Sequence, residues 1–262
     1  MSFAERLDAA VEASGSLLCV GLDPDGFDDP EAAERFCVEV LDATLEHVCA
    51  VKANLAFFEQ FGSAGYAILE RLRARVPAVR ILILDGKRGD IANSAEAYAR
   101  ALFDVLGADA VTVNPLMGHD AVAPFLGRPE RGAFLVTRSS NPGAADLFDT
   151  AITDHATVYS RIVDLGLGWD SDGAVGFVVG ATEPSVVAWV RRRAVDAPLL
   201  LPGVGAQGGS LEEAVRSGLN ARGGRVLVAV SRAIANAPEG PAAAAVAFRD
   251  RIAAVRNEVA TA

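Results

Sequence analysis

The sequence predicts an α/β fold, a closed (β/α)8 TIM barrel formed as one domain over residues 1–262. Short apolar runs rich in β-branched residues alternate with amphipathic stretches from one end of the chain to the other. The apolar runs are continuous, which is typical of parallel strands buried on both faces. Strand followed by helix implies parallel pairing through right-handed crossovers, and eight such units in about 250 residues fit a barrel.

The predicted strands are short and end in polar or glycine-rich turns. They cover residues 17–22, 48–53, 80–84, 110–113, 133–137, 174–179, 199–201 and 225–230. An open doubly wound sheet is the alternative, and its first strand is usually followed by a Gly-x-Gly-x-x-Gly turn. Residues 21–26 read GLDPDG, which does not match that pattern. The barrel is therefore the favoured architecture.

Between the strands, apolar side chains recur at helical spacing. Helices are predicted over residues 31–46, 56–75, 95–106 and 238–259. Pro184 suits the first turn of another helix, and Ser210 followed by Glu213 matches a capping box. Residues 164–173 are predicted as a short loop, and the arginines at 191–193 as the solvated end of a helix.

The charge balance limits the partners that the chain can have. Asp plus Glu number 34 and Lys plus Arg number 24, which gives a net charge of −10. Nucleic acid and anionic membranes would repel such a chain, so neither is expected as a partner, although a small anionic ligand needs only one positive pocket. No apolar stretch approaches the roughly 20 residues of a membrane helix. The charged, helix-like N-terminus does not resemble a signal peptide, so a cytoplasmic location is expected.

Cysteine and histidine show no metal-binding pattern. The cysteines are odd in number and lack CxxC spacing, so reduced, buried thiols are expected at Cys19, Cys37 and Cys49. The histidines lack metal-ligand spacing, and they stand at His47, His119 and His155. These residues therefore predict no metal site.

Functional residues of such barrels lie at the C-terminal ends of the strands, where this sequence places two clusters. In the first, Asp85 and Lys87 follow the third strand. These two residues are two positions apart, so in an extended chain their side chains would point the same way and each would keep the other charged. Lys52, near the end of the second strand, is placed to join them. The alternative is a ring of ion pairs that only closes the barrel end.

The second cluster combines a glycine-rich turn over residues 202–209 with Arg232 after the eighth strand. Glycine amides can approach an anion closely, and arginine binds phosphate with two parallel hydrogen bonds. Barrel enzymes often bind phosphate after strands seven and eight. The alternative is that the glycines only form tight turns. The patterns assign no role to Asn114, His119 or Arg138.

Several motifs together resemble the orotidine 5′-phosphate decarboxylase family, in its bacterial branch with longer chains. They are Asp-x-Lys-x-x-Asp at 85–90, Val-Lys-x-Asn at 51–54, Thr-Val-Asn-Pro at 112–115, Ser-Asn-Pro-Gly at 140–143 and Pro-Gly-Val-Gly-Ala-Gln-Gly-Gly at 202–209. The resemblance spans nearly the whole chain. It implies a homodimer that decarboxylates orotidine 5′-monophosphate to uridine 5′-monophosphate without a cofactor, in de novo pyrimidine biosynthesis.

The resemblance also implies roles for individual residues. Lys87 is implied as the proton donor to C6 of the pyrimidine, and Asp85 as the carboxylate beside the carboxylate of the substrate. Lys52 and Asp90 complete an alternating charge array. Asp90 and Ser94 are implied to reach in from the partner subunit. The implied substrate contacts are Asp23 and Ser94 with the ribose, Ser140 with the pyrimidine, Gln207 between base and phosphate, Arg232 with the phosphate, and Pro202 in the same pocket.

Three other functions stay open from the residues alone. A sugar-phosphate decarboxylase or synthase of the same superfamily would often need Mg²⁺. A Schiff-base aldolase would use Lys52 or Lys87 as an amine, but neighbouring aspartates keep a lysine protonated. A catalytically silent phosphate-binding barrel would bind nucleotide and release no CO2.

Overall fold

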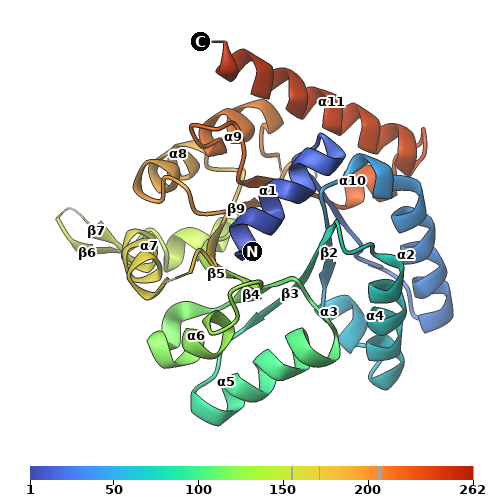
Figure 1. Ribbon diagram of the computed structural model, residues 1–262, viewed down its shortest axis with the longest axis horizontal. Helices are drawn as coiled ribbons and strands as arrows, with labels where there is room; N and C mark the ends of the chain where they lie inside the picture. The colour runs from blue at the N-terminus through green and yellow to red at the C-terminus, as the bar shows by residue number, and fades with distance from the viewer. Residues whose placement is uncertain (155, 171, 206–207, 262) are drawn as a thin grey trace.

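The computed structural model describes residues 1–154, 156–170, 172–205 and 208–261. Within these residues, parallel strands close into a barrel in the order β1-β10-β9-β8-β5-β4-β3-β2. Figure 1 shows this barrel end-on. The predicted (β/α)8 barrel is confirmed. Its strands are β1 (Leu18–Gly21), β2 (Ala50–Asn54), β3 (Ile81–Arg88), β4 (Ala110–Val113), β5 (Gly132–Arg138), β8 (Val175–Val179), β9 (Leu199–Leu201) and β10 (Val226–Val230).

The burial of the strands explains why their sequences are continuous apolar runs. Every residue of β1, β4, β5, β8, β9 and β10 is buried. Side chains of one face fill the barrel and those of the other pack under the surrounding helices, so neither face tolerates a polar alternation.

Helices surround the barrel, and α1 lies across one end of it (Figure 1). In that end contact, the Phe3 backbone N–H donates to the Pro129 carbonyl, and Arg6 pairs with Asp109 just before β4. This is therefore the N-terminal end of the strands. The α-helices are α1 (Phe3–Ser14), α2 (Pro30–Thr44), α3 (Ala56–Glu59), α4 (Ser63–Arg75), α5 (Ala92–Ala99), α6 (His119–Leu126), α7 (Val158–Trp169), α8 (Pro184–Arg193), α9 (Leu211–Gly218), α10 (Arg232–Ala235) and α11 (Pro241–Ala260).

Several shorter elements complete the described chain. The 3-10 helices are η1 (Leu45–His47), η3 (Pro115–Met117) and η4 (Pro142–Asp146), and a π-helix, η2 (Arg100–Val105), continues α5. An antiparallel hairpin of β6 (Ala151–Thr153) and β7 (Ala156–Thr157) projects from the barrel beside α7 (Figure 1). In the described residues, no helix combines the length and the apolar character needed to cross a bilayer.

The predicted helices are found at the expected positions in the sequence, but one of them is interrupted. Pro184 opens α8, and Ser210 caps α9 by accepting from the Glu213 backbone N–H at 3.3 Å. The helix predicted over 56–75 is broken into α3 and α4 at Gly62, whose φ of 58° a side chain would disfavour. The sequence patterns predict neither α6 nor the hairpin.

The loop predicted over residues 164–173 is wrong for its first half, because α7 continues to Trp169. Ile162, Val163 and Gly166 form the buried face of this helix. The segment contains three glycines, which favour a loop, whereas burial of the apolar face keeps the helix intact through Gly166 and Gly168.

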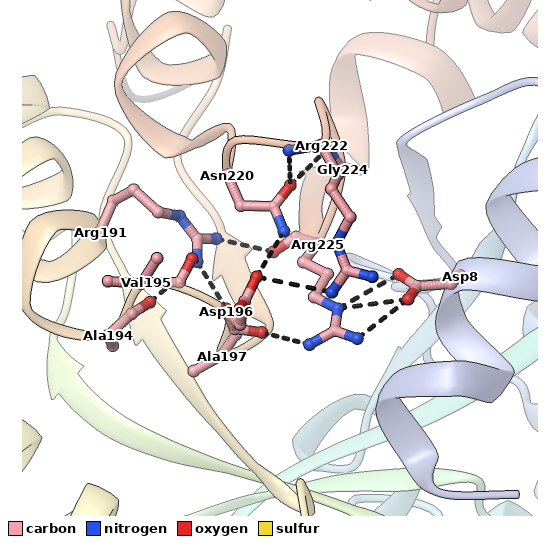
Figure 2. Close-up of polar contacts among 10 residues, drawn as sticks. All are labelled: Asp8, Arg191, Ala194, Val195, Asp196, Ala197, Asn220, Arg222, Gly224 and Arg225. Atoms are coloured by element: carbon pink, nitrogen blue, oxygen red, sulfur yellow. Dashed lines mark hydrogen bonds and ion pairs between the residues drawn. The ribbon is translucent and has the colours of Figure 1, made fainter.

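The prediction of a solvated arginine triplet is wrong for Arg191, which is buried at the end of α8. Its guanidinium donates to five backbone carbonyls, those of Ala194, Val195, Ala197, Gly218 and Arg225. Burial lowers the pKa of Arg191 to about 10. Figure 2 shows the surrounding network, in which Arg225 pairs with Asp8 at 3.0 Å and donates to the Asp196 carbonyl at 2.8 Å. The network joins α1, α8, α9 and the start of β10.

Candidate active site

A pocket of about 430 Å³ opens at the C-terminal ends of the barrel strands. This volume lies in the range of small-molecule sites. Lys87 from β3 and Arg232 from the segment after β10 both line it, so one ligand can touch both. Seven of the ten predicted site residues line the pocket, namely Asp23, Lys52, Asp85, Lys87, Ser140, Pro202 and Arg232.

An alternating row of charges crosses the floor of the pocket. Asp85 Oδ1 accepts a hydrogen bond from Lys87 Nζ at 2.7 Å, and Asp85 Oδ2 lies 3.3 Å from Lys52 Nζ. Lys52 Nζ in turn lies 3.7 Å from Asp23 Oδ1. Lys52 and Asp85 are buried, whereas 47% of the Lys87 side chain is exposed toward the pocket. The predicted meeting of Lys52, Asp85 and Lys87 is confirmed.

Burial and charge oppose each other at the centre of this row. Burial acts to raise the pKa of Asp85, but Lys52, Lys87 and the hydrogen bond from Thr112 outweigh it and hold that pKa well below its usual range. Burial acts to lower the pKa of Lys52, but Asp23 and Asp85 outweigh it and raise that pKa above its usual value. Both groups are therefore charged at neutral pH.

Lys87 does not have the extended backbone that the sequence predicted. Its φ is 45°, in the left-handed region, and the β3–β4 register shifts between Leu84 and Arg88. A non-glycine residue in this conformation carries strain of about 1–3 kcal/mol. The irregular end of β3 therefore directs the Lys87 ammonium to Asp85, where a regular strand was expected to do so.

Thr112 in β4 is a residue of this centre to which the sequence patterns gave no role. Its buried hydroxyl donates to Asp85 Oδ1 at 2.8 Å and accepts from the Lys87 backbone N–H at 2.8 Å. One side chain thus holds both the carboxylate and the strained backbone. A lone hydroxyl in the apolar run of β4 was the signal available in the sequence.

Comparison with known proteins agrees with this geometry. The family model described as "Orotidine 5'-phosphate decarboxylase / HUMPS family" matches residues 16–248. The chain belongs to the orotidine 5′-phosphate decarboxylase family. The resemblance in the motifs is therefore confirmed, while the assignment to one branch stays a prediction.

Individual relatives support the family assignment over nearly the full length. The orotidine 5′-phosphate decarboxylase of Roseiflexus castenholzii is 46% identical over 255 residues, which are 94% of this chain and 93% of that protein. The relative from Thermomicrobium roseum is 45% identical over 99% of this chain and 98% of its own. The structure of Leishmania donovani OMP decarboxylase aligns with a TM-score of 0.91 and 40% identity, covering 98% of this chain and 100% of that one.

Two predicted site residues of this decarboxylase-family chain, Asp90 and Ser94, are not brought to the pocket. Asp90 is half-buried and accepts from the Ile91 backbone N–H at 2.7 Å, and Ser94 is exposed at the start of α5. Neither lines the pocket within the described residues. Gln207 lies outside the described residues.

The polar residues that the sequence left unassigned have local partners in this family member. Asn114 Oδ1 accepts from the Leu116 backbone N–H and caps η3. The His119 ring packs against Trp169 with centroids 5.6 Å apart. Arg138 forms an ion pair with Asp149 beside the pocket.

Proposed function

We propose that the pocket at the C-terminal ends of the strands decarboxylates orotidine 5′-monophosphate with Lys87 as the proton donor. As a member of its family the chain is a carboxy-lyase that forms uridine 5′-monophosphate in pyrimidine biosynthesis. The observation that carries the assignment of Lys87 is its position. Its ammonium is fixed at 2.7 Å from Asp85 and shares one pocket with Arg232.

The chemistry requires a fixed positive charge next to C6. When the bond between C6 and the carboxylate breaks, its electron pair stays on C6 in the plane of the ring, where the π system cannot delocalise it. A preorganised ammonium stabilises such a carbanion and can then donate its proton to C6. The products are CO2 and the 6-H pyrimidine nucleotide, and Lys87 regains a proton from water.

The neighbouring charges orient Lys87. Asp85 accepts its hydrogen bond, while Lys52 is buried between Asp85 and Asp23 and has little freedom to move. Because the carboxylates and ammonium ions alternate, each ion is balanced by its neighbours. We assign Asp23 to the ribose, because it stands at the opposite end of the charge row from Lys87 and also lines the pocket.

The far side of the pocket suits the remaining parts of the nucleotide. Arg232, Pro202 and Ser140 all line the pocket, and we assign the phosphate to Arg232 and the pyrimidine to Ser140. We assign Gln207 to the bridge between base and phosphate. Binding energy from the phosphate would then be used to hold the base against Lys87.

We further propose a homodimer in which Asp90 and Ser94 complete the site of the partner subunit. Both residues lie on the segment from β3 to α5, away from their own pocket. Large apolar side chains are exposed on α5, on η3 and on the turn before α5, namely Ile91, Tyr98, Leu116 and Met117. Exposed large apolar side chains on these segments would suit a surface that another chain covers. The three buried, free thiols favour a reducing compartment, and we infer the cytoplasm.

Loss of absorbance of orotidine monophosphate, measured with and without EDTA, tests the reaction. Lys87→Ala should fold and lose turnover, and near-full activity would refute the proton-donor role. Arg232→Ala should lower kcat/KM by more than about tenfold, since it removes the phosphate cation. Loss of activity with EDTA would instead favour a metal-dependent sugar-phosphate enzyme, and binding without CO2 release a silent barrel.

Mixing of two inactive variants tests the shared site. Lys87→Ala and Asp90→Ala chains should together regain activity, because one site of the heterodimer has both residues intact. If subunit exchange is confirmed and no activity returns, Asp90 acts in its own subunit.

A further inference from the structure

Arg138, the last residue of β5, is a buried cation that lies beside the pocket without lining it. Its guanidinium donates two parallel hydrogen bonds to Asp149, from Nε to Oδ1 and from Nη2 to Oδ2, both at 3.0 Å. Nη2 also lies 3.5 Å from Glu183 Oε1, and Nη1 donates to the Ser139 carbonyl at 3.3 Å. Only 8% of the arginine side chain is exposed.

The partners of Arg138 belong to two different segments at the C-terminal end of the barrel. Asp149 lies between η4 and the β6–β7 hairpin, and Glu183 immediately precedes α8. The arginine therefore ties the long connection that follows β5 to the short connection that follows β8. A bidentate arginine–carboxylate pair fixes orientation as well as distance.

The turn of residues 139–141 begins the connection that follows β5, and it contacts the connection that follows β8. It lines the pocket, and its serine carbonyl at 140 accepts from Thr182 Oγ1 at 3.4 Å. The Gly180 backbone N–H donates to the Arg138 carbonyl at 2.8 Å, and a Cβ at Gly180 would lie 2.7 Å from Ser140 Cα. The turn thus has little room to retreat from the pocket.

We propose that Arg138, held by Asp149 and Glu183, is a positioning residue that fixes the turn of residues 139–141 as the pocket wall against the pyrimidine base. A buried ion pair adds little net stability compared with apolar residues of the same volume, so its contribution here is geometric. The inference rests on the proposed function in one respect, that the base lies on this side of the pocket. The phosphate is assigned to Arg232, which is not among the partners of Arg138 or Asp149 in the contacts above.

Two ligands separate this role from a general effect on folding. Uridine 5′-monophosphate carries base and phosphate, whereas ribose 5-phosphate lacks the base. In the Asp149→Asn variant, which keeps the shape of a half-exposed side chain, the affinity for the nucleotide should fall by at least about tenfold, a change of about 1.4 kcal/mol. The affinity for ribose 5-phosphate should change less than about twofold. Arg138→Lys, which keeps the charge and loses the fork, should give an intermediate loss of nucleotide affinity.

The matched control is Arg193→Met, which removes an exposed arginine–aspartate pair with Asp164 on the outside of the barrel and should change neither affinity. Unchanged nucleotide affinity in Asp149→Asn, or an equal loss for both ligands, would overturn the inference. Ser140→Ala is measured in parallel. If it leaves nucleotide affinity unchanged, the base contact assigned to Ser140 is refuted, while a selective loss in Asp149→Asn still supports the role of Arg138 through the rest of the turn.

Discussion

Removing the buried cation from the charge row is the most demanding test of the site electrostatics. Lys52→Met replaces an ammonium that has only 8% of its side chain exposed with a neutral side chain of similar length. It leaves Asp85 with Lys87 as its one ammonium partner in the row, and it leaves Asp23 without its ammonium partner. The change therefore exposes what the row contributes to both stability and turnover.

Coulomb's law gives the size of the effect. At an effective dielectric constant of about 20, an ion pair is worth about 5 kcal/mol at the 3.3 Å between Lys52 and Asp85, and about 4–5 kcal/mol at the 3.7 Å between Lys52 and Asp23. The variant no longer has to desolvate an ammonium, which offsets several kcal/mol. We expect a net loss of about 3–5 kcal/mol in the free energy of unfolding, the range found when a buried ion loses its partner.

The pH dependence of that loss identifies its cause. In the native protein the pKa of Asp85 lies below its value in the unfolded chain. The stability that the Asp85 carboxylate contributes is therefore fully present above the pKa of the unfolded chain, and it is lost only as the pH falls through the lower pKa of the folded protein. Without Lys52 the pKa of Asp85 rises, so protonation removes the cost of burying this carboxylate at a higher pH. The gap between variant and native protein should therefore be narrower at pH 5 than at pH 7.

Urea unfolding at both pH values, followed by circular dichroism, measures the two free energies, and the decarboxylation assay measures kcat. Turnover should fall by at least about a hundredfold, comparable with the loss of one preorganised electrostatic donor. If the free energy of unfolding of the variant at pH 7 lies within about 1 kcal/mol of the native value, Lys52 does not stabilise Asp85 and Asp23 as expected.

Two further predictions concern buried groups. Thr112→Val removes both hydrogen bonds of the hydroxyl, so the free energy of unfolding should fall by about 1–3 kcal/mol and kcat by at least about tenfold; unchanged kcat would show that Lys87 does not need this anchor. Burial raises the pKa of Cys19 and Cys37 to about 12, so each thiol stays protonated in the fold while the unfolded chain ionises. Each should therefore cost about 1.4 kcal/mol of stability per pH unit above about pH 8.5. In Cys37→Ala the decrease in unfolding free energy between pH 8.5 and 9.5 should be smaller by about 1 kcal/mol, because the unfolded thiol is only half ionised at pH 8.5, and an identical decrease would contradict the burial argument.

The barrel was predictable because its strands are buried on both faces. Strands buried on both faces have continuous apolar sequences, which can be recognised in the sequence directly. The meeting of Lys52 and Asp85 followed from the same logic, since parallel strands adjacent in sequence place their C-terminal ends together, and the observed register pairs Asn54 with Asp85. The family motifs added roles that the runs alone do not contain.

The errors share a physical cause, which is contact between segments distant in sequence. Arg191 looked like a solvated helix end because its carbonyl partners include residues near 218 and 225, which local pattern does not reveal. Thr112 and the left-handed backbone of Lys87 depend on each other across two strands. The continuation of α7 depends on burial that a glycine-containing sequence does not show by itself.

The arginine network in Figure 2 and the substrate pocket occupy opposite ends of the barrel. Arg191 secures the N-terminal approach to β9, a strand of three residues whose other end continues into the pocket at Pro202. The contacts that Arg191 makes are thereby separate from the residues that line the pocket. Loops at the catalytic rim can accumulate changes, by natural drift or by engineering toward other nucleotides, while the opposite end keeps the scaffold closed.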